Sequence, residues 1–232
     1  MSKVIALVED EKDIRDNYAH WLRKQGYEVV EYSNRDQASK GFAQKLPDLA
    51  ILDIGLEDEP EGGFDLCREL RAESVSLPII FLSALDSDFD MISGLRLGAD
   101  DYLTKDVSLP FLQARVSALF RRMEALSQPE NQQAKITRGD LILDTDRFTA
   151  TWQAKDLGLT LTEFWMLHAL VVRPGHVKQR EQLLRDANVI VEENTITSHV
   201  KRMRRKFEAI SDGFDYVETV YGVGYRWSGP AE

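Results

Sequence analysis

Four short apolar runs in the first half of the chain each end beside residues that can take part in chemistry. The residues that follow these runs are Glu9 and Asp10, then Asp53, then Ser83, then Lys105. Carboxylates are the hard oxygen ligands that Mg²⁺ prefers, and a cation reduces the repulsion between a carboxylate and an incoming phosphoryl group. Ser83 and Lys105 would then donate hydrogen bonds to phosphoryl oxygens. Together these residues predict that Asp53 accepts phosphate with the help of Mg²⁺ or another divalent cation.

These residues come together only if the four runs are parallel strands of one sheet. A further run, "YEVVEY", completes a series of five strands that alternate with five helical patterns. Such alternation predicts an α/β domain with a parallel sheet covered on both faces, whose sites lie beyond the carboxyl ends of the strands. Each residue alone also has a purely structural interpretation, because acidic residues after strands often form turns or cap helices.

The composition is that of a soluble globular protein. The chain has 232 residues, of which 43% are hydrophobic and 29% charged, and one cysteine, Cys67. A single cysteine suits a reducing compartment, and no apolar stretch is long enough for a membrane span. We therefore expect a cytoplasmic protein that does not enter the membrane.

Charge and pattern both change in the middle of the chain. Residues 1–135 hold 16 Lys/Arg against 25 Asp/Glu, a net charge of −9, whereas residues 136–232 hold 13 against 14, a net charge of −1. The polar stretch "LSQPENQQAK" lies at the change and is typical of a linker. We predict a first domain at 1–124, a linker at 125–135 and a second domain at 136–232 with different partners.

The second half follows the pattern of an α+β winged helix-turn-helix domain. Alternating short strands come first, and three helices follow, the first opening with Thr160 and Glu163 at the spacing of a capping box. The chain closes with "YVETVYGVGYRW", which predicts a hairpin with Gly222 and Gly224 at its turn.

The last predicted helix, "ENTITSHVKRMRRKFEAI", has one apolar and one basic face. The apolar face holds Ile196, Val200, Met203, Phe207 and Ile210. The other face holds Asn194, Thr197, Ser198, Lys201, Arg202, Arg204 and Arg205. A helix of this kind fits the major groove of DNA; the alternative is a solvated basic face on a structural helix.

The motifs "ALVEDE", "PDLAILDIGL", "PIIFLSA" and "GLRLGADDYLTK" resemble the receiver domain of two-component response regulators over residues 3–123. The resemblance implies a flavodoxin-like fold with strand order 2-1-3-4-5, and Asp53 as the phosphoryl acceptor. It implies that Glu9, Asp10 and the backbone carbonyl of Gly55 bind Mg²⁺ together with Asp53. It also implies that Ser83 and Tyr102 form the switch pair and that Lys105 is the phosphoryl-binding lysine.

The receiver motif departs from the family pattern around Asp53 and Lys105. Glu57 stands where a proline is usual, and the pair Gly63 and Phe64 comes about two residues late, so the loop that holds Glu57, Asp58, Glu59 and Glu61 is longer and more acidic. We expect a solvated loop whose charge tunes kinase docking or Mg²⁺ binding. Asp106 replaces a proline that follows a cis peptide bond in the family; because a cis bond costs ~3 kcal/mol before other residues, we expect a trans or a strained bond.

The stretch "GLRLGADDYLTKDVSLPFLQARVSALFRR" is similar to the OmpR/PhoB subfamily, whose receivers dimerise through the helix, strand and helix that end the domain. The resemblance places these residues on the dimer face: Met91, Asp100, Asp101, Phe111, Arg115 and Arg122. Met91 and Phe111 stand where the subfamily has an ion pair, so we expect a Met–aromatic contact instead. The alternative is that both belong to the core of the monomer.

Residues 136–228 resemble the DNA-binding domain of the same subfamily. The resemblance places Thr197, Ser198 and Arg202 against bases, and it places Asn194, Thr195, His199, Lys201 and Arg204 near phosphates. It also implies head-to-tail binding to direct repeats. Tyr221 stands where the wing usually offers an arginine, and the loop "RDANVIVEE", a usual contact of RNA polymerase, is short.

The sequence therefore predicts a transcriptional response regulator and not an enzyme. A sensor histidine kinase would phosphorylate Asp53, the receivers would form a homodimer, and the winged helices would bind promoter DNA, with RNA polymerase as a further partner. A phosphatase that forms an aspartyl phosphate is one alternative, and a regulator of this family that ignores phosphate is another.

Overall fold

The computed structural model of the chain describes residues 2–57, 59–84, 88–124, 135–187 and 193–231. By its contacts the chain divides into two compact units, Met1–Arg115 and Val116–Glu232, which are described separately below. The predicted linker lies outside the described residues up to position 134, as does the middle of the "RDANVIVEE" loop.

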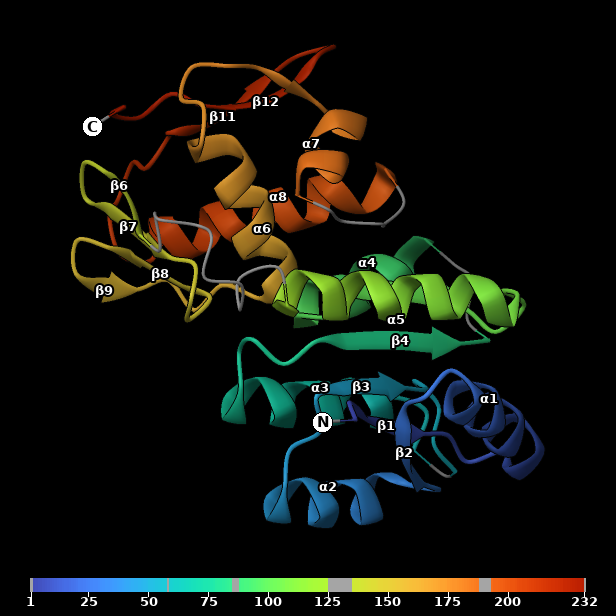
Figure 1. Cartoon of the computed structure of the whole chain (residues 1–232). Helices are drawn as coiled ribbons and strands as arrows, with labels where there is room; N and C mark the ends of the chain where they lie inside the picture. Colours follow the sequence, from blue (N-terminus) through green and yellow to red (C-terminus); the bar gives the residue numbers. More distant parts are fainter. Residues whose placement is uncertain (1, 58, 85–87, 125–134, 188–192, 232) are drawn as a thin grey trace. The chain divides into compact units, whose positions relative to one another are not determined.

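The first unit is built on a five-stranded parallel sheet (Figure 1). Its strands are β1 (Val4–Val8), β2 (Glu28–Tyr32), β3 (Leu49–Leu52), β4 (Ile79–Ser83) and β5 (Asp101–Thr104). Their order is β2-β1-β3-β4-β5, and every adjacent pair is parallel. This is the predicted order, so the carboxyl ends of the strands meet at one edge of the sheet.

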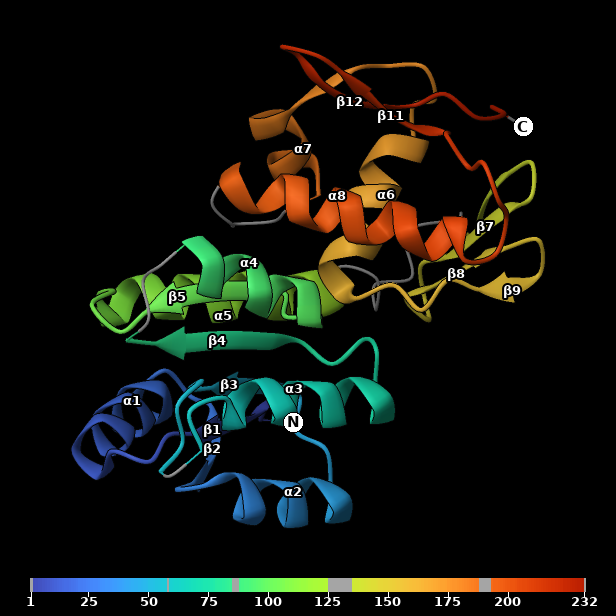
Figure 2. The same ribbon diagram turned by 180° about the vertical axis from the view of Figure 1, so that it is seen from behind.

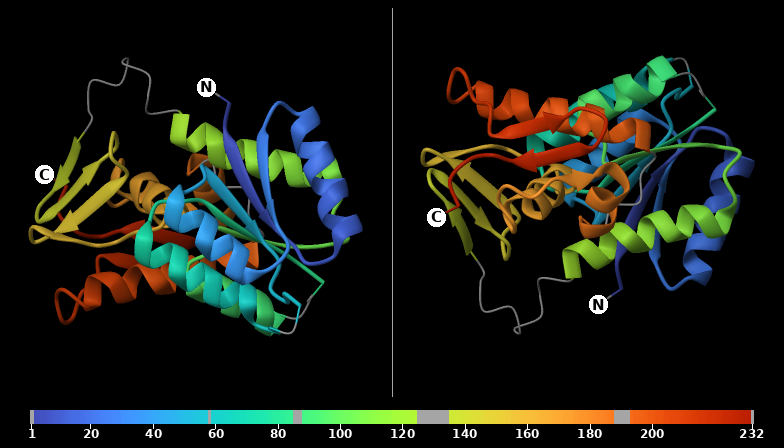
Figure 3. Two further views of the ribbon diagram at one scale, coloured as in Figure 1. Left: turned by 90° about the horizontal axis from the view of Figure 1, so that it is seen from below. Right: turned by 90° about the horizontal axis from the view of Figure 1, so that it is seen from above.

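Helices lie on both faces of this sheet. They are α1 (Lys12–Lys24), α2 (Arg35–Gln44), α3 (Gly62–Glu73), α4 (Asp88–Leu97) and α5 (Leu109–Glu124), of which α5 continues into the second unit. Figure 3 shows α2 and α3 on one face and α1 on the other. Phe42 of α2 and Phe64 and Leu70 of α3 are buried against β-strand residues such as Leu52 and Phe81. Burial of these apolar side chains is the main force that fixes the helices on the sheet.

The second unit begins with a four-stranded antiparallel sheet and continues with a helical domain that a hairpin completes. Its elements are β6 (Lys135–Arg138), β7 (Leu141–Asp144), β8 (Thr149–Trp152), β9 (Lys155–Asp156), α6 (Leu161–Val171), β10 (Lys178–Gln179), α7 (Arg180–Asp186), α8 (Glu193–Glu208), β11 (Val217–Val220) and β12 (Gly224–Trp227). Strands β10, β12 and β11 form a second sheet in that order. Figure 2 shows α8 against α6 in this unit. Three helices followed by a hairpin are the predicted winged helix-turn-helix.

An aromatic cluster joins the two sheets of the second unit to α8. The rings of Phe207 and Phe214 stack with centroids 4.0 Å apart. Trp152 of β8 contacts Phe207 edge to face at 5.5 Å, and Trp227 of β12 lies 6.3 Å from Phe207. Aromatic pairs of this kind add to area burial, so the cluster holds α8 in place from its C-terminal end.

The start of α3 approaches the end of β3 so closely that only glycine fits at position 63. A Cβ atom there would lie 1.9 Å from the carbonyl oxygen of Asp53. The approach allows the amide of Gly63 to donate a 2.9 Å hydrogen bond to the carbonyl of Ile54. Gly63 therefore fixes the loop that begins at Asp53.

We predict that Gly63→Ala lowers the free energy of unfolding of the first unit by about 2–3 kcal/mol, because the methyl group forces the backbone apart. Gly55→Ala is the matched control, since a Cβ at Gly55 meets nothing within 4 Å. Urea denaturation followed by circular dichroism measures both variants. Equal stability of the two variants would contradict the close approach.

Candidate functional site

Three carboxylates gather at the carboxyl edge of the parallel sheet. Glu9 and Asp10 follow β1 and Asp53 follows β3, and one oxygen from each lies within 4.8 Å of the others. Glu9 is 1% and Asp53 6% exposed, so two of the three are buried. Three hard oxygen donors at this separation match the ligand chemistry of Mg²⁺, and the structure thus brings together the side chains that the sequence assigned to a cation.

Lys105 ties these carboxylates together from the end of β5. Its Nζ lies 2.7 Å from Oδ2 of Asp53 and 2.9 Å from the carboxylate of Glu9. The backbone amide of Lys105 donates to the carbonyl of Ser83, which places the lysine beside β4. A lysine that contacts the acceptor carboxylate can also contact a phosphoryl group bound to it.

Burial and like charge make this cluster electrostatically strained. Desolvation raises the pKa of Glu9 to about 7, the nearby charge of Asp53 adds to the rise, and the hydrogen bond from Lys105 opposes it. Desolvation likewise raises the pKa of Asp53 against the effect of Lys105. Burial alone would lower the pKa of Lys105, but its bonds to Asp53 and Glu9 outweigh that effect and raise it. The single ammonium group does not balance the carboxylates, which favours a bound cation.

Polar groups from β3 and β4 complete the surroundings of Asp53. The amide of Ile54 donates a 2.7 Å hydrogen bond to Oδ1 of Asp53. Ser83 is 2% exposed, and its hydrogen bond is one of the effects that lower the pKa of Asp53. Tyr102 is 4% exposed and lies inward, with its ring 6.2 Å from that of Phe81. Of the switch pair that the resemblance implies, Ser83 therefore lies at the pocket and Tyr102 lies in the core.

The peptide bond after Lys105 is trans, as the replacement of proline by Asp106 suggested, because the described residues contain no cis peptide bond. The Asp106 side chain is exposed and accepts a hydrogen bond from the hydroxyl of Thr104. The hydroxyl of Tyr18 in α1 donates a 3.1 Å bond to the carbonyl of Lys105. Contacts on both sides of the bond thus hold Lys105 in place without a proline.

The acidic loop after β3 is exposed at Glu57, Glu59 and Glu61, as predicted, but it is more ordered than a solvated loop. Leu56 and Glu59 exchange two backbone hydrogen bonds of 3.0 and 2.8 Å around a tight turn. Glu57 adopts a φ of 51° within it and donates its amide to Oδ2 of Asp10 at 3.0 Å. No local sequence pattern predicts this contact, because it joins residues that lie far apart along the chain.

The residues assigned to a dimer face divide into two groups. Asp100 is fully buried, pairs with Arg71 at 2.9 Å and accepts from the amide of Ile79, so its predicted place on the face is corrected to the interior. Asp101 lies 3.5 Å from Arg115. The Arg115 guanidinium sits 4.6 Å over the ring of Phe111, which is 42% exposed.

Met91 and Arg122 are the remaining residues that the sequence assigned to the dimer face. Met91 is partly buried and packs against the core of the first unit, as the monomer-core alternative held. The side chain of Arg122 lies outside the described residues.

Helix α8 presents the two faces that its sequence predicted. Ile196, Val200, Met203 and Phe207 are at most 1% exposed. Thr197, Lys201 and Arg205 are exposed and Ser198 is partly exposed on the other side, while the side chain of Asn194 lies outside the described residues. Ile210 falls in the turn beyond the helix. The helix therefore offers a basic, polar face to a partner.

Two residues assigned to DNA are buried in the second unit, and a third, Arg202, is partly buried and pairs with a residue of the interior. Thr195 is 3% exposed and His199 fully buried. The Arg202 guanidinium bonds the carboxylate of Glu163 and lies 3.3 Å from Oγ1 of Thr160. The sequence pattern placed Arg202 on the polar face of the helix, but its guanidinium pairs with the buried carboxylate of Glu163. We correct these three assignments.

Glu163 is fully buried and has two cationic partners, Arg202 and Lys206 of α8. It also forms the capping box with Thr160 at the start of α6, as predicted. Desolvation would raise its pKa, but the charges of Arg202 and Lys206 outweigh this and lower the pKa to about 2. Buried charge thus fixes the register of α8 on α6.

The hairpin after α8 holds the remaining candidates. Arg204 donates to the carbonyl of Val217 at 2.7 Å and to Oγ1 of Thr219 at 2.8 Å, so it links α8 to β11. Oγ1 of Thr197 lies 3.3 Å from the hydroxyl of Tyr225 in β12. Tyr221, between β11 and β12, is 92% exposed. An exposed aromatic side chain at the hairpin tip is placed to touch a partner.

Comparison with known proteins assigns both units to described families. Residues 5–117 match the response regulator receiver domain, and residues 154–227 match the C-terminal domain of transcriptional regulatory proteins. The chain is 38% identical over 230 residues to the transcriptional regulatory protein BaeR of Escherichia coli O6:H1, covering 98% of this chain and 93% of that protein. It is 34% identical to the transcriptional regulatory protein CreB of Escherichia coli (strain K12), with 98% of each chain covered.

Two solved structures are similar to this chain over nearly all of its length. A mutant form of RitR matches with a TM-score of 0.74 at 27% identity, covering 97% of this chain and 99% of that one. The response regulator DrrB, described as a Thermotoga maritima OmpR/PhoB homolog, matches with a TM-score of 0.51 at 28% identity, covering 99% and 100%.

The chain belongs to the two-component response regulators of the OmpR/PhoB type. It is a transcriptional regulator with a receiver domain and a winged-helix DNA-binding domain, and the relatives on which this rests are regulators, not phosphatases. Among the described residues, no helix is both long and apolar enough to span a membrane.

We predict that Glu163→Gln destabilises the DNA-binding domain by about 3 kcal/mol at pH 7, because two cations lose their buried partner while the cap hydrogen bond is kept. Since the folded pKa of Glu163 is about 2 and its unfolded value 4.5, its contribution is complete above pH 4.5 and is lost as the pH falls towards 2. Between pH 4.5 and pH 2, the stability of Glu163→Gln should therefore depend less on pH than the stability of the wild type.

Thermal melts between pH 2 and 7 measure this effect. Glu218→Gln is the matched control, because Glu218 also pairs with an arginine, Arg226, but at the surface. A Glu163→Gln curve parallel to that of the wild type at all pH values would contradict the prediction.

Proposed function

We propose that Asp53 accepts a phosphoryl group from a sensor histidine kinase. The observation that carries the proposal is the position of Asp53 between two carboxylates and the ammonium group of Lys105 at one edge of the sheet. The carboxylate attacks phosphorus, and the phosphoryl bond to the donor breaks as the new bond to Asp53 forms. Lys105 then exchanges part of its contact with Asp53 for the phosphoryl oxygens, and the Ser83 hydroxyl donates to another.

Glu9, Asp10, Asp53 and the backbone carbonyl of Gly55 would hold the divalent cation, for which we propose Mg²⁺. When bound, it supplies positive charge that offsets the charge of the carboxylates and of the incoming phosphoryl group. The donor chemistry fits, because the three side chains give oxygen ligands alone.

Phosphorylation would favour a homodimer. Ser83 and Tyr102 are the proposed switch residues, and a state in which they move towards the phosphoryl group would pair more strongly. For the face we propose Phe111 and Arg122, together with Asp101 and Arg115, which are 3% and 4% exposed in this structure and would have to move to reach a partner. Asp101 and Arg115 pair within one chain in this structure, so dimerisation through them requires an exchange of partners, with Phe111 as an exposed apolar contact.

The DNA-binding face that we propose contains fewer residues than the sequence predicted. Thr197 and Ser198 of α8 would contact bases in the major groove, with Asn194, Lys201 and Arg204 near phosphates and Tyr221 at the adjacent minor groove. Two such domains would bind direct repeats in promoter DNA, and RNA polymerase would be the further partner. The modest net charge of −1 on residues 136–232, from 13 Lys/Arg against 14 Asp/Glu, makes affinity depend on this dimer.

A member of the family that ignores phosphate is the remaining alternative for this chain. The exposed Asp106 and the acidic loop add negative charge around the site, which favours this alternative. The intact set of carboxylates, lysine and serine favours phosphorylation.

We predict that the wild-type protein gains one phosphoryl group from acetyl phosphate only when Mg²⁺ is present, and that Asp53→Asn gains none. Asp106→Asn is the control, because it removes an exposed carboxylate next to Lys105 that is not part of the acidic cluster. Intact-protein mass spectrometry gives the number of phosphoryl groups. Full labelling of Asp53→Asn would place the acceptor elsewhere, and an unlabelled wild type would support the alternative.

We predict that Lys201→Ala weakens binding to every DNA sequence about equally and reduces the slope of log K against log salt by about 1. Lys155→Ala in β9 is the control, since Lys155 is exposed on a different element of the same domain. Fluorescence anisotropy at several salt concentrations measures both slopes. An unchanged slope for Lys201→Ala would remove α8 from the DNA interface.

A further inference from the structure

Arg35, the first residue of α2, contacts acidic residues on both the loop after β3 and helix α3. Its Nη1 lies 2.9 Å from Oε2 of Glu59 in the loop and 3.4 Å from Asp65 of α3. Its Nη2 and Nε donate to Oε1 of Glu69, one turn further along α3, at 2.6 and 3.1 Å. The guanidinium fork thus binds the loop with one part and α3 with the other, a geometry that lysine could not reproduce.

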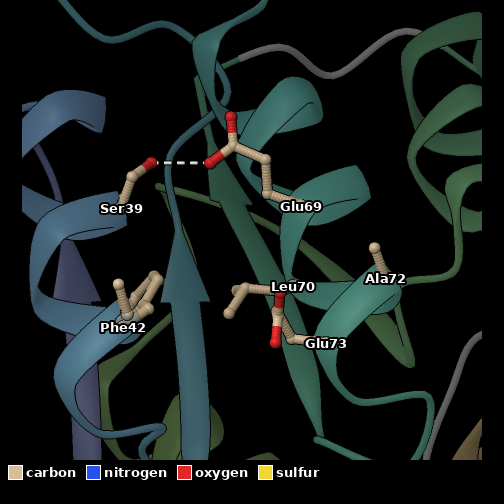
Figure 4. Close-up of a pocket in the computed structure, with 7 residues that line it drawn as sticks. Ser39, Phe42, Glu69, Leu70, Ala72 and Glu73 are labelled. Carbon is tan, nitrogen blue, oxygen red and sulfur yellow. Dashed lines mark hydrogen bonds between the residues drawn. The ribbon is translucent and has the colours of Figure 1, made fainter.

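The anchor on α3 is itself held in place. Ser39 of α2 donates a 2.6 Å hydrogen bond to the second carboxylate oxygen of Glu69 (Figure 4). Ser39 and Glu69 line one end of a cavity of about 480 Å³ between α2 and α3, with Phe42 and Leu70 further along it. Because both oxygens of Glu69 have donors, Arg35 has a fixed position from which to hold the loop.

The acidic loop that Arg35 contacts also contacts Asp10, a proposed ligand of the cation. Glu59 is joined to Leu56 by two backbone hydrogen bonds, and the turn between them sets the amide of Glu57 3.0 Å from Oδ2 of Asp10. Asn34, the residue before Arg35, donates to the Glu57 carboxylate at 3.3 Å. One continuous path of contacts therefore runs from Arg35 through Glu59 and the turn to Asp10.

We propose that Arg35 is a positioning residue for the cation site, which acts through the acidic loop on the orientation of Asp10. The proposal rests on the proposed function, because Asp10 is there assigned to the cation. Hydrogen bonds to metal ligands orient them and so raise metal affinity. The loop insertion that makes this receiver unusual then has a role: its charge is held by Arg35, and its backbone supports Asp10.

Two accounts of Arg35 predict opposite effects on Mg²⁺ affinity. If Arg35 acted only by its charge, its loss would strengthen cation binding, because a positive charge near the site repels Mg²⁺. If Arg35 positions the loop, its loss weakens binding in spite of the favourable change in charge. Since Arg35 and Glu59 are both partly exposed, salt screens their attraction, and the difference between wild type and variant should shrink as the salt concentration rises.

The test is titration of the full-length protein with Mg²⁺ alone by isothermal titration calorimetry. For Arg35→Gln we expect a dissociation constant about threefold to tenfold above that of the wild type at low salt, a smaller loss than removal of a direct partner of a metal ligand. Lys40→Gln is the matched control, because this substitution removes the same charge from α2, and among the residues that the structure describes Lys40 pairs only with Asp36 of its own helix. It should bind Mg²⁺ as tightly as the wild type or more tightly.

Glu59→Gln and the double variant identify the route of the effect. If Arg35 and Glu59 act along the same path, the double variant binds Mg²⁺ no more weakly than the single variant that binds it more weakly. If the two charges act independently, their effects on Mg²⁺ affinity have opposite signs and add in the double variant. Arg35→Gln affinity equal to or above that of Lys40→Gln would overturn the proposal while leaving Asp53 as the acceptor. A wild type that binds no Mg²⁺ would overturn the proposed cation site itself, and the role of Arg35 with it.

Discussion

The buried contact between Lys105 and the carboxylates of Asp53 and Glu9 is the interaction on which the receiver depends. It brings the ends of β1, β3 and β5 together, and it depends on a parallel sheet in which β1 lies beside the central strand β3. Desolvation of these buried carboxylates raises the pKa of Glu9 and of Asp53, and one ammonium group does not balance their charge. The same imbalance gives a cation and a phosphoryl group a reason to bind there.

The second domain uses buried charge for a different purpose. Glu163 joins α6 to α8 through Arg202 and Lys206, and both partners are close enough to keep it ionised. This pairing orients α8 so that Lys201 and Thr197 face outward. In the receiver, charge is left unbalanced where chemistry takes place; in the DNA-binding domain, charge is balanced where a helix must be held.

Short apolar runs that alternate with helices were sufficient to predict the parallel sheet and the set of residues around Asp53, and the resemblance to receiver domains supplied the strand order. The sequence was misleading for Arg202, since helical periodicity assigns a residue to a face by its Cα position and does not say where a long side chain ends. His199 was placed near phosphates by the resemblance, yet its side chain is fully buried. Asp100 was assigned to the surface by its resemblance to known dimer faces, yet Arg71 and the amide of Ile79 hold it inside. The Arg35 contacts involve residues more than twenty positions apart, and no local pattern predicts them.

In the function that we propose, the state of Asp53 controls pairing of the chain and thereby its binding to DNA. Gel filtration with light scattering, with and without beryllofluoride and Mg²⁺, tests it most directly, because the beryllium complex takes the place of a phosphoryl group on the carboxylate. We expect the mass to change from one chain to two only when both reagents are present. A mass that stays the same under all conditions would contradict the account and identify the chain as a regulator that does not respond to phosphate.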